Sequence, residues 1–146
     1  MSDPVVVDSS LATKWVLNEP GTAIARQLLL GWVRQTTTRL APCWFAAEIA
    51  VALYKRMRWG DITSDEVDRA LRDILATVTL RTESASITVR AIEIAAMLGQ
   101  GRPYDSMYLA LAEREGCELW TADQRFYNAV RARFPQVRWL GTYPGA

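Results

Sequence analysis

Short strand-like segments alternate with longer helical segments along this chain, and this alternation restricts the fold more than any other feature. Short strands are predicted over residues 5–8, 39–41, 78–80, 117–121 and 137–140, and all but the second contain the β-branched or aromatic residues typical of strands. Helices are predicted between them over residues 22–33, 42–58, 86–98, 104–115 and 124–134, with one more starting at residues 63–66. Strands joined by helices pair in parallel and are covered on both faces. We therefore predict an α/β fold with a central parallel sheet of about five strands flanked by helices.

Several of the predicted helix ends carry local signals. Pro42 suits the first position of the helix over residues 42–58, because that position needs no backbone N–H donor. The sequence TSDE at residues 63–66 has the pattern of a capping box. Gly99 and Gly116 follow two predicted helices directly, and glycine commonly terminates helices at that position.

Length and composition predict one ordinary domain over residues 1–146, since 50% of the 146 residues are hydrophobic. No apolar run approaches the roughly 20 residues that span a bilayer, and MSDPVVVDSS at the N-terminus lacks the basic and apolar regions of a signal peptide. We expect a cytoplasmic protein with no membrane association. Cys43 and Cys117 lack the spacing of a zinc site and are expected to be buried free thiols.

The chain contains no histidine, which excludes Ser-His-Asp and Cys-His catalytic sites and any mechanism with imidazole as the general base. Catalysis, if the chain performs it, must depend on carboxylates. Of the 17 basic residues, 15 are arginine, whose planar guanidinium suits bidentate contacts with phosphate. A polyanionic partner is one explanation of this enrichment, and a GC-rich coding sequence is the other.

Four acidic residues occupy unusual positions. Asp8 directly follows the strand-like VVV, and Asp123 follows the strand over residues 117–121, so both lie at the carboxyl edge of the predicted sheet, where open α/β sheets bind ligands. Glu48, in CWFAAEIAVALY, stands in the middle of an apolar helix where a charge has no solvated face. Asp105, in GRPYDSMYLALAE, begins another helix.

Each acid also has a structural explanation to be weighed. Asp105 and Asp123 could be helix N-caps, and Asp8 could accept backbone hydrogen bonds from the turn that follows it. Glu48 has no such explanation, because a buried carboxylate needs a partner or a raised pKa. Clustered carboxylates repel one another unless a cation lies among them, and their hard oxygen atoms suit Mg²⁺ or Mn²⁺. A shared metal site explains all four positions at once.

The motifs VVVDSS, FAAEIAVAL, PYDSMYLALA and LWTADQRFY resemble those of the PIN-domain ribonucleases in their order and spacing, and the resemblance covers the whole chain. It is greatest to the VapC-type toxins of toxin–antitoxin pairs, including the run DSSLATKW. The resemblance implies a PIN-like three-layer fold and a metal-dependent endoribonuclease. It also implies an RNA substrate, a small antitoxin partner whose apolar helix and trailing arginine occupy the active-site groove, and a homodimer. Some relatives carry a further acid after the last one, whereas residues 124–126 here are Gln, Arg and Phe.

By the same resemblance, Asp8, Glu48, Asp105 and Asp123 match the acidic positions of the family, and Thr121 matches the hydroxyl residue beside the last acid. Metal ions held by carboxylates lower the pKa of a bound water and neutralise charge on a phosphodiester under attack. We expect the three aspartates to be direct or water-mediated ligands, Glu48 a further ligand or the base that orients the water, and Thr121 an orienting residue.

Basic residues near these motifs are candidates for RNA contacts. Lys14 and Arg102 are favoured because they lie close in sequence to the acidic motifs. The KRMR cluster at residues 55–58 is a further candidate, but cations at the end of a helix also complement its dipole, and that explanation is favoured.

Other functions remain as alternatives. A dehalogenase-type phosphatase needs a second aspartate two residues after the first, and Ser10 occupies that position here. A receiver domain needs an acidic pair ahead of its strand-end aspartate and a lysine after the last strand, and the sequence has neither feature. A structure-specific DNA nuclease of related fold and a non-catalytic PIN-like binding module stay open. The four intact acids argue against the second.

Overall fold

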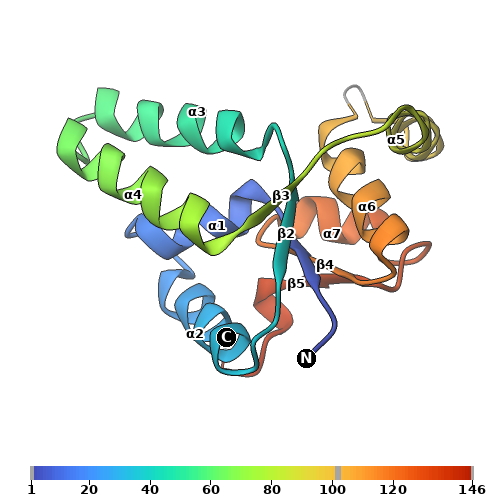
Figure 1. Ribbon diagram of the computed structural model, residues 1–146, viewed down its shortest axis with the longest axis horizontal. Coiled ribbons are helices and arrows are strands. Elements are labelled where there is room, and N and C mark those ends of the chain that lie inside the picture. Colours follow the sequence, from blue (N-terminus) through green and yellow to red (C-terminus); the bar gives the residue numbers. More distant parts are fainter. Residues whose placement is uncertain (1, 101–102, 146) are drawn as a thin grey trace.

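The computed structural model describes residues 2–100 and 103–145, which form one five-stranded parallel sheet with helices on both faces (Figure 1). The strands are β1 (Val5–Val7), β2 (Arg39–Pro42), β3 (Thr79–Arg81), β4 (Glu118–Thr121) and β5 (Val137–Trp139). Their order across the sheet is β3-β2-β1-β4-β5, and every neighbouring pair is parallel. The predicted fold class is confirmed.

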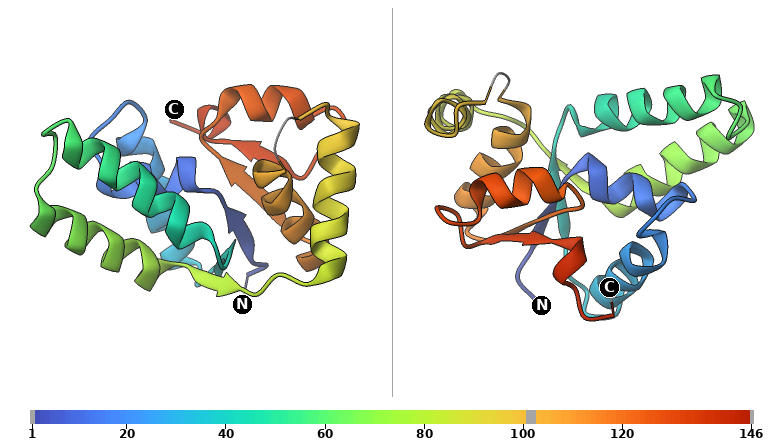
Figure 2. Two further views of the ribbon diagram at one scale, coloured as in Figure 1. Left: turned by 90° about the horizontal axis from the view of Figure 1, so that it is seen from above. Right: turned by 180° about the vertical axis from the view of Figure 1, so that it is seen from behind.

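Seven α-helices connect the strands and form the two outer layers (Figure 2). They are α1 (Ser9–Val16), α2 (Thr22–Arg34), α3 (Phe45–Arg58), α4 (Ser64–Thr77), α5 (Ala85–Met97), α6 (Tyr104–Glu115) and α7 (Gln124–Val130), and a 3₁₀ helix η1 (Leu140–Thr142) follows β5. Right-handed crossovers place α1 to α4 on one face and α5 to α7 on the other, because the chain moves across the sheet in opposite directions before and after β3. No helix among the described residues is long and apolar enough to cross a membrane.

Strand β1 lies at the centre of the sheet, where the two halves of the fold meet, and this arrangement positions the candidate site. The first crossover leads from β1 to β2 on one side, whereas β4 later pairs with β1 on the other side, with Val7 beside Trp120. This pairing continues one step beyond the strand, because the backbone N–H of Asp8 donates to Trp120 O at 3.2 Å. The carboxyl ends of β1 and β4 therefore form the topological switch point at which open α/β sheets bind ligands.

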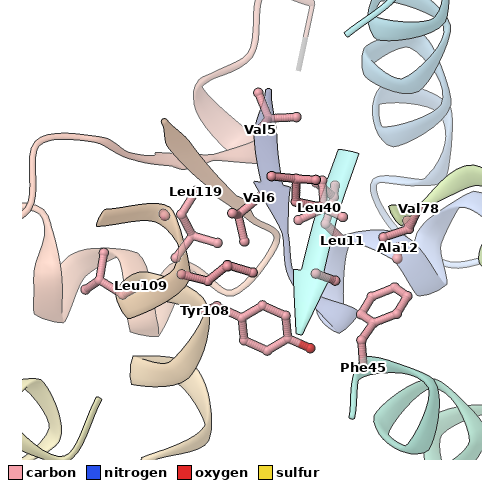
Figure 3. Close-up of a cluster of buried hydrophobic side chains, with 14 of the residues drawn as sticks. Val5, Val6, Leu11, Ala12, Leu40, Phe45, Val78, Tyr108, Leu109 and Leu119 are labelled. Carbon is pink, nitrogen blue, oxygen red and sulfur yellow. The ribbon is translucent and has the colours of Figure 1, made fainter. Parts of the chain in front are cut away.

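The hydrophobic core lies on both faces of β1, whose three valines are all buried. Leu11 and Ala12 of α1 cover one face, and Tyr108 and Leu109 of α6 contribute to the other (Figure 3). Burial of β1 on both faces fixes the residue after it at the carboxyl edge of the sheet. The position of Asp8 thus follows from the most buried strand of the fold.

Three expectations about secondary structure were wrong. Pro42 is the last residue of β2 and not a helix start; α3 begins three residues later at Phe45. The helix predicted over residues 124–134 ends at Val130, and residues 131–133 form turns. The short helix α1 was not predicted, since its eight residues are too few for a clear helical period.

The two cysteines also differ from each other. Cys117 is buried, as expected, but Cys43 is exposed. Glu83 accepts hydrogen bonds from the backbone N–H of Cys43 at 2.9 Å and from its thiol at 2.7 Å. The hydrogen bond from the thiol, followed by desolvation and the charge of Glu83, raises the pKa of the thiol. The prediction of a buried thiol at Cys43 was wrong because the residue lies in the turn between β2 and α3, outside the sheet.

Candidate active site

Asp8 is a buried carboxylate at the carboxyl end of β1 and the N-cap residue of α1. Its Oδ1 accepts hydrogen bonds from the backbone N–H of Leu11 at 3.0 Å and from the hydroxyl of Ser10 at 2.7 Å. The residue is only 6% exposed. The predicted turn contacts of Asp8 are therefore present, but they do not remove the cost of its burial, because its pKa remains raised.

Ser10 and Thr121 connect the ends of the two central strands. The Ser10 hydroxyl accepts a hydrogen bond from the backbone N–H of Ala122 at 3.1 Å and lies 3.3 Å from the Thr121 hydroxyl. Thr121, which is fully buried, accepts a hydrogen bond from the backbone N–H of Asp123 at 2.9 Å. These bonds hold the segment after β4 against the start of α1, so the backbone positions of Asp8 and Asp123 are fixed relative to each other.

Asp123 and Asp105 begin helices in different ways. Asp123 is the N-cap of α7, and its Oδ1 accepts from the backbone N–H of Phe126 at 3.0 Å, so the capping explanation is correct for this residue. Asp105 is not a cap: Pro103 holds the N-cap position of α6, and Asp105 lies within the first turn. Both aspartates are exposed, in contrast to Asp8.

Glu48 lies in the first turn of α3 and not in the middle of a buried helix, so the sequence-based description of its surroundings was wrong. The residue is half-buried, and α3 also has an exposed face that includes Val51 and Tyr54. Glu48 does have a partner, because the Tyr108 hydroxyl donates to its Oε1 at 2.5 Å. Figure 3 shows the Tyr108 ring among the buried side chains, with its hydroxyl on the side of the ring that faces Phe45.

The carboxylates influence one another electrostatically. Burial raises the pKa of Asp8 to about 7, although hydrogen bonds from Thr121 and Ser10 oppose the rise, and the charge of Asp105 adds to it. Burial raises the pKa of Glu48, the hydrogen bond from Tyr108 opposes this rise, and the charge of Asp105 adds to it.

The charge of Asp105 raises the pKa of Asp8 and of Glu48, and the pKa of Asp105 is in turn raised by Asp123. The pKa of Asp105 is raised first by desolvation from the surrounding protein and then by the charge of Asp123. The structure therefore brings all four predicted acids into one electrostatically coupled group, with Asp105 central to it.

The donor atoms of this group fit a hard divalent cation, because they are carboxylate oxygens and the chain has no histidine. The spacing of these oxygen atoms does not form a complete coordination site. Within residues 2–100 and 103–145, no three histidine, cysteine, aspartate or glutamate side chains lie close enough together to hold a metal ion. Among the four acids, Asp105 and Asp123 are exposed, although Asp123 is held by its capping bond to Phe126, whereas Asp8 is buried.

The basic residues predicted to contact RNA differ in the partners that they have in the structure. Lys14 donates to Glu19 Oε1 at 3.2 Å and to Pro20 O at 2.8 Å, so its ammonium group stabilises the turn before α2. Arg102 lies outside the described residues. In the cluster at residues 55–58, Arg56 forms ion pairs with Glu19 at 3.2 Å and Asp61 at 2.8 Å. Lys55 and Arg58 are exposed in the last turn of α3, where cations complement the helix dipole.

Sequence analysis did not assign roles to Ser9, Ser10 and Tyr108, although all three contact the acids. The Ser9 side chain opposes the rise in the pKa of both Glu48 and Tyr108. The sequence does contain a signal for the two serines, because the motif DSS places two hydroxyl groups directly after the acid at the end of a strand. Tyr108 follows Asp105 by three residues, which is close to one helical turn and places both side chains toward the same side of α6.

The fold and site together define a small α/β protein with a group of four acidic side chains at the switch point of a parallel sheet. The family model of the PIN domain matches residues 5–132, and the chain belongs to the PIN domain family. No curated protein matches the sequence.

Three solved structures share the fold. PAE2754 from Pyrobaculum aerophilum is 21% identical, with a TM-score of 0.69 over 97% of this chain and 94% of that one. A toxin–antitoxin complex from Klebsiella pneumoniae contains a chain 18% identical, with a TM-score of 0.66 over 93% and 97%. VapC20 of Mycobacterium tuberculosis, a toxin that cleaves the sarcin–ricin loop, is 16% identical, with a TM-score of 0.68 over 92% and 98%.

Proposed function

We propose that this protein is a metal-dependent endoribonuclease and the toxin of a VapC-type toxin–antitoxin pair. The observation that carries this proposal is the coupled group of Asp8, Glu48, Asp105 and Asp123 at the carboxyl edge of the sheet. Membership of the PIN domain family supports a nuclease. The structural similarity to VapC20 and to a chain in a toxin–antitoxin complex supports the toxin assignment.

The chain's own residues supply position and charge for cleavage of a phosphodiester bond. Asp8 is the fixed point of the site, because α1 and Ser10 hold its carboxylate. Tyr108 orients Glu48, which is then placed to accept a proton from an attacking water. Thr121 and Ser10 hold the backbone that carries Asp123.

A divalent ion, Mg²⁺ or Mn²⁺, is the cofactor that the donor set suits, held by Asp8, Asp105 and Asp123, with Glu48 as a further ligand or the base. When bound, it supplies a water of lowered pKa and positive charge against the phosphate oxygens. The exposed side chain of Asp105 has no capping role, so it is the one that can turn toward a shared ion, while Asp123 offers its second carboxylate oxygen. Such binding would also relieve the repulsion that Asp105 exerts on Asp8 and Glu48.

Cleavage of labelled single-stranded RNA by the purified protein tests the proposal. We expect cutting with Mg²⁺ or Mn²⁺, none with EDTA, and none from Asp8→Asn or Asp105→Asn. The control is Asp3→Asn, the same substitution at an exposed aspartate before β1, at the opposite edge of the sheet. Equal cutting in EDTA would refute the metal mechanism, and faster cutting of DNA than of RNA would favour a DNA nuclease.

The proposed partners are an antitoxin protein and a second copy of the chain. Expression of the chain alone should slow growth, and co-expression of the neighbouring open reading frame should restore it. Harmless expression of a catalytically active chain would contradict the toxin assignment. The homodimer is proposed from the family resemblance, and light scattering of the purified protein measures it directly.

A further inference from the structure

A groove leads away from the candidate active site along one face of α3. It has a volume of about 760 Å³, and the residues that line it include Ser9 and Glu48 at one end and Lys55 and Trp59 at the other. From Glu48 to Trp59 the helix rises about 16 Å, which is long enough for several nucleotides of an extended strand. Because the groove opens onto Glu48, a substrate held at the acids has a continuous path into it.

Exposed aromatic rings stand at both ends of this groove. Tyr104, directly before Asp105, is 55% exposed, and its ring meets that of Trp44 edge to face with centroids 5.6 Å apart. Trp59 is 71% exposed at the far end. Open aromatic rings stack on nucleic acid bases regardless of sequence.

The charged residues that line the groove differ along its length. Glu48 lies at the active-site end, while Lys55, Arg56 and Glu19 line the other end. Arg56 is paired with Glu19 and Asp61, so it contributes little free charge, whereas Lys55 is exposed. A strand whose scissile phosphate lies at the acids would thus have its outlying phosphates near Lys55.

We propose that this groove binds the RNA strand flanking the scissile phosphate, with one base stacked on Tyr104 beside Trp44 and another on Trp59. Lys55 contacts a phosphate between or beyond these bases. The inference rests on the proposed ribonuclease function and adds to it the path of the substrate. An antitoxin that covers the same groove would inhibit the enzyme by competing with RNA for these rings.

Equilibrium binding tests this path separately from cleavage. A short fluorescein-labelled single-stranded RNA of mixed sequence is titrated with full-length Asp8→Asn protein in EDTA, and fluorescence anisotropy reports binding. In this background, Tyr104→Ala and Trp59→Ala should each weaken binding about 5- to 100-fold, the range expected for loss of one base stack. Tyr104→Phe should retain binding because it keeps the ring. The control is Tyr54→Ala, since Tyr54 is equally exposed on α3 but lies outside the groove.

The charge contact has its own readout. In the same assay, Lys55→Ala should reduce the slope of log affinity against log salt concentration by about 1, with Arg58→Ala on the same helix turn as the comparison. RNA affinity unchanged in both aromatic-to-alanine variants would overturn the proposal. So would variants that bind RNA normally and lose only the antitoxin, because the groove would then belong to the protein partner.

Failure of the proposed function would look different. If the parent protein binds RNA in a manner that depends on Tyr104 and Trp59 yet does not cut it with Mn²⁺, the groove assignment stands and the nuclease assignment fails. If the parent cuts RNA and the aromatic variants cut and bind equally well, the nuclease assignment stands and the groove assignment fails.

Discussion

Replacing Asp8 with asparagine should stabilise the metal-free protein at neutral pH, even though Asp8 is the most buried acid of the site. Burial raises the pKa of Asp8 from its ordinary value of 3.8 to about 7. Asparagine removes the charge and keeps the Oδ1 atom that accepts from Leu11 and Ser10. The variant therefore retains the cap of α1 and loses only the cost of an enclosed negative charge.

The expected size of this effect depends on pH. Below about pH 4 the carboxyl group is protonated in both the folded and the unfolded chain, so it contributes no difference. Between about pH 4 and 7 the unfolded chain releases the proton more easily than the folded one, so the stability of the parent falls as pH rises. Above pH 7 the accumulated loss is about 4 kcal/mol, taken from the pKa difference at about 1.4 kcal/mol per unit. Asp8→Asn has no such loss.

Urea unfolding in EDTA, at several pH values between 4 and 8, measures this difference. The free energies of unfolding of the parent and Asp8→Asn should coincide at the acid end and diverge toward pH 8, with the variant more stable. Asp123→Asn is the matched control, because Asp123 caps α7 in the same way but is exposed. A difference between parent and Asp8→Asn that stays constant over the whole range would refute the reasoning.

Three further variants test other contacts by urea unfolding and activity. Tyr108→Phe removes the hydrogen bond to Glu48 and should cost about 1 to 2 kcal/mol of stability. It should also lower RNA cleavage under conditions in which the variant is still fully folded. Unchanged cleavage would reject an orienting role for Tyr108. Gly141→Ala places a Cβ 2.3 Å from the ring of Trp139 and should cost about 1 to 3 kcal/mol, whereas a neutral result would show that the indole moves freely. Thr63→Ala removes the cap of α4 and should cost about 0.5 to 2 kcal/mol without changing cleavage.

The fold was predictable because local and global signals agree. The three valines of β1 are buried on both faces, as a continuous β-branched run predicts for a central parallel strand. The capping box at residues 63–66 begins α4 as predicted. Gly116 ends α6 with a φ of +63°, a conformation that glycine adopts without strain. Each of these features depends on residues close together in the sequence.

The surroundings of the acids were not predictable in the same way, because they depend on contacts between distant segments. Glu48 and Tyr108 are 60 residues apart, and only the packing of α6 against the sheet brings them together. Ser10 and Thr121 are 111 residues apart and meet because β4 pairs with β1. Hydrophobic periodicity identifies which face of a helix is buried, but it does not identify the residue from another element that the face meets.

Helix capping and metal ligation, treated as alternatives for the acids at the level of sequence, are compatible in the structure. Asp8 and Asp123 are the N-caps of α1 and α7, while Glu48 and Asp105 lie in the first turns of α3 and α6. Every one of these four helices starts at the carboxyl edge of the sheet and carries one acid of the site at its positive end. Each such placement typically contributes about 0.3 to 1 kcal/mol.

These favourable dipole interactions partly offset the repulsion among four carboxylates before any cation binds. The capping bonds of Asp8 and Asp123 each use one carboxylate oxygen, Oδ1, and a carboxylate has lone pairs on two. The same acids can therefore start the helices and ligate a divalent ion, and substitution by asparagine separates these two roles because it preserves the first and weakens the second.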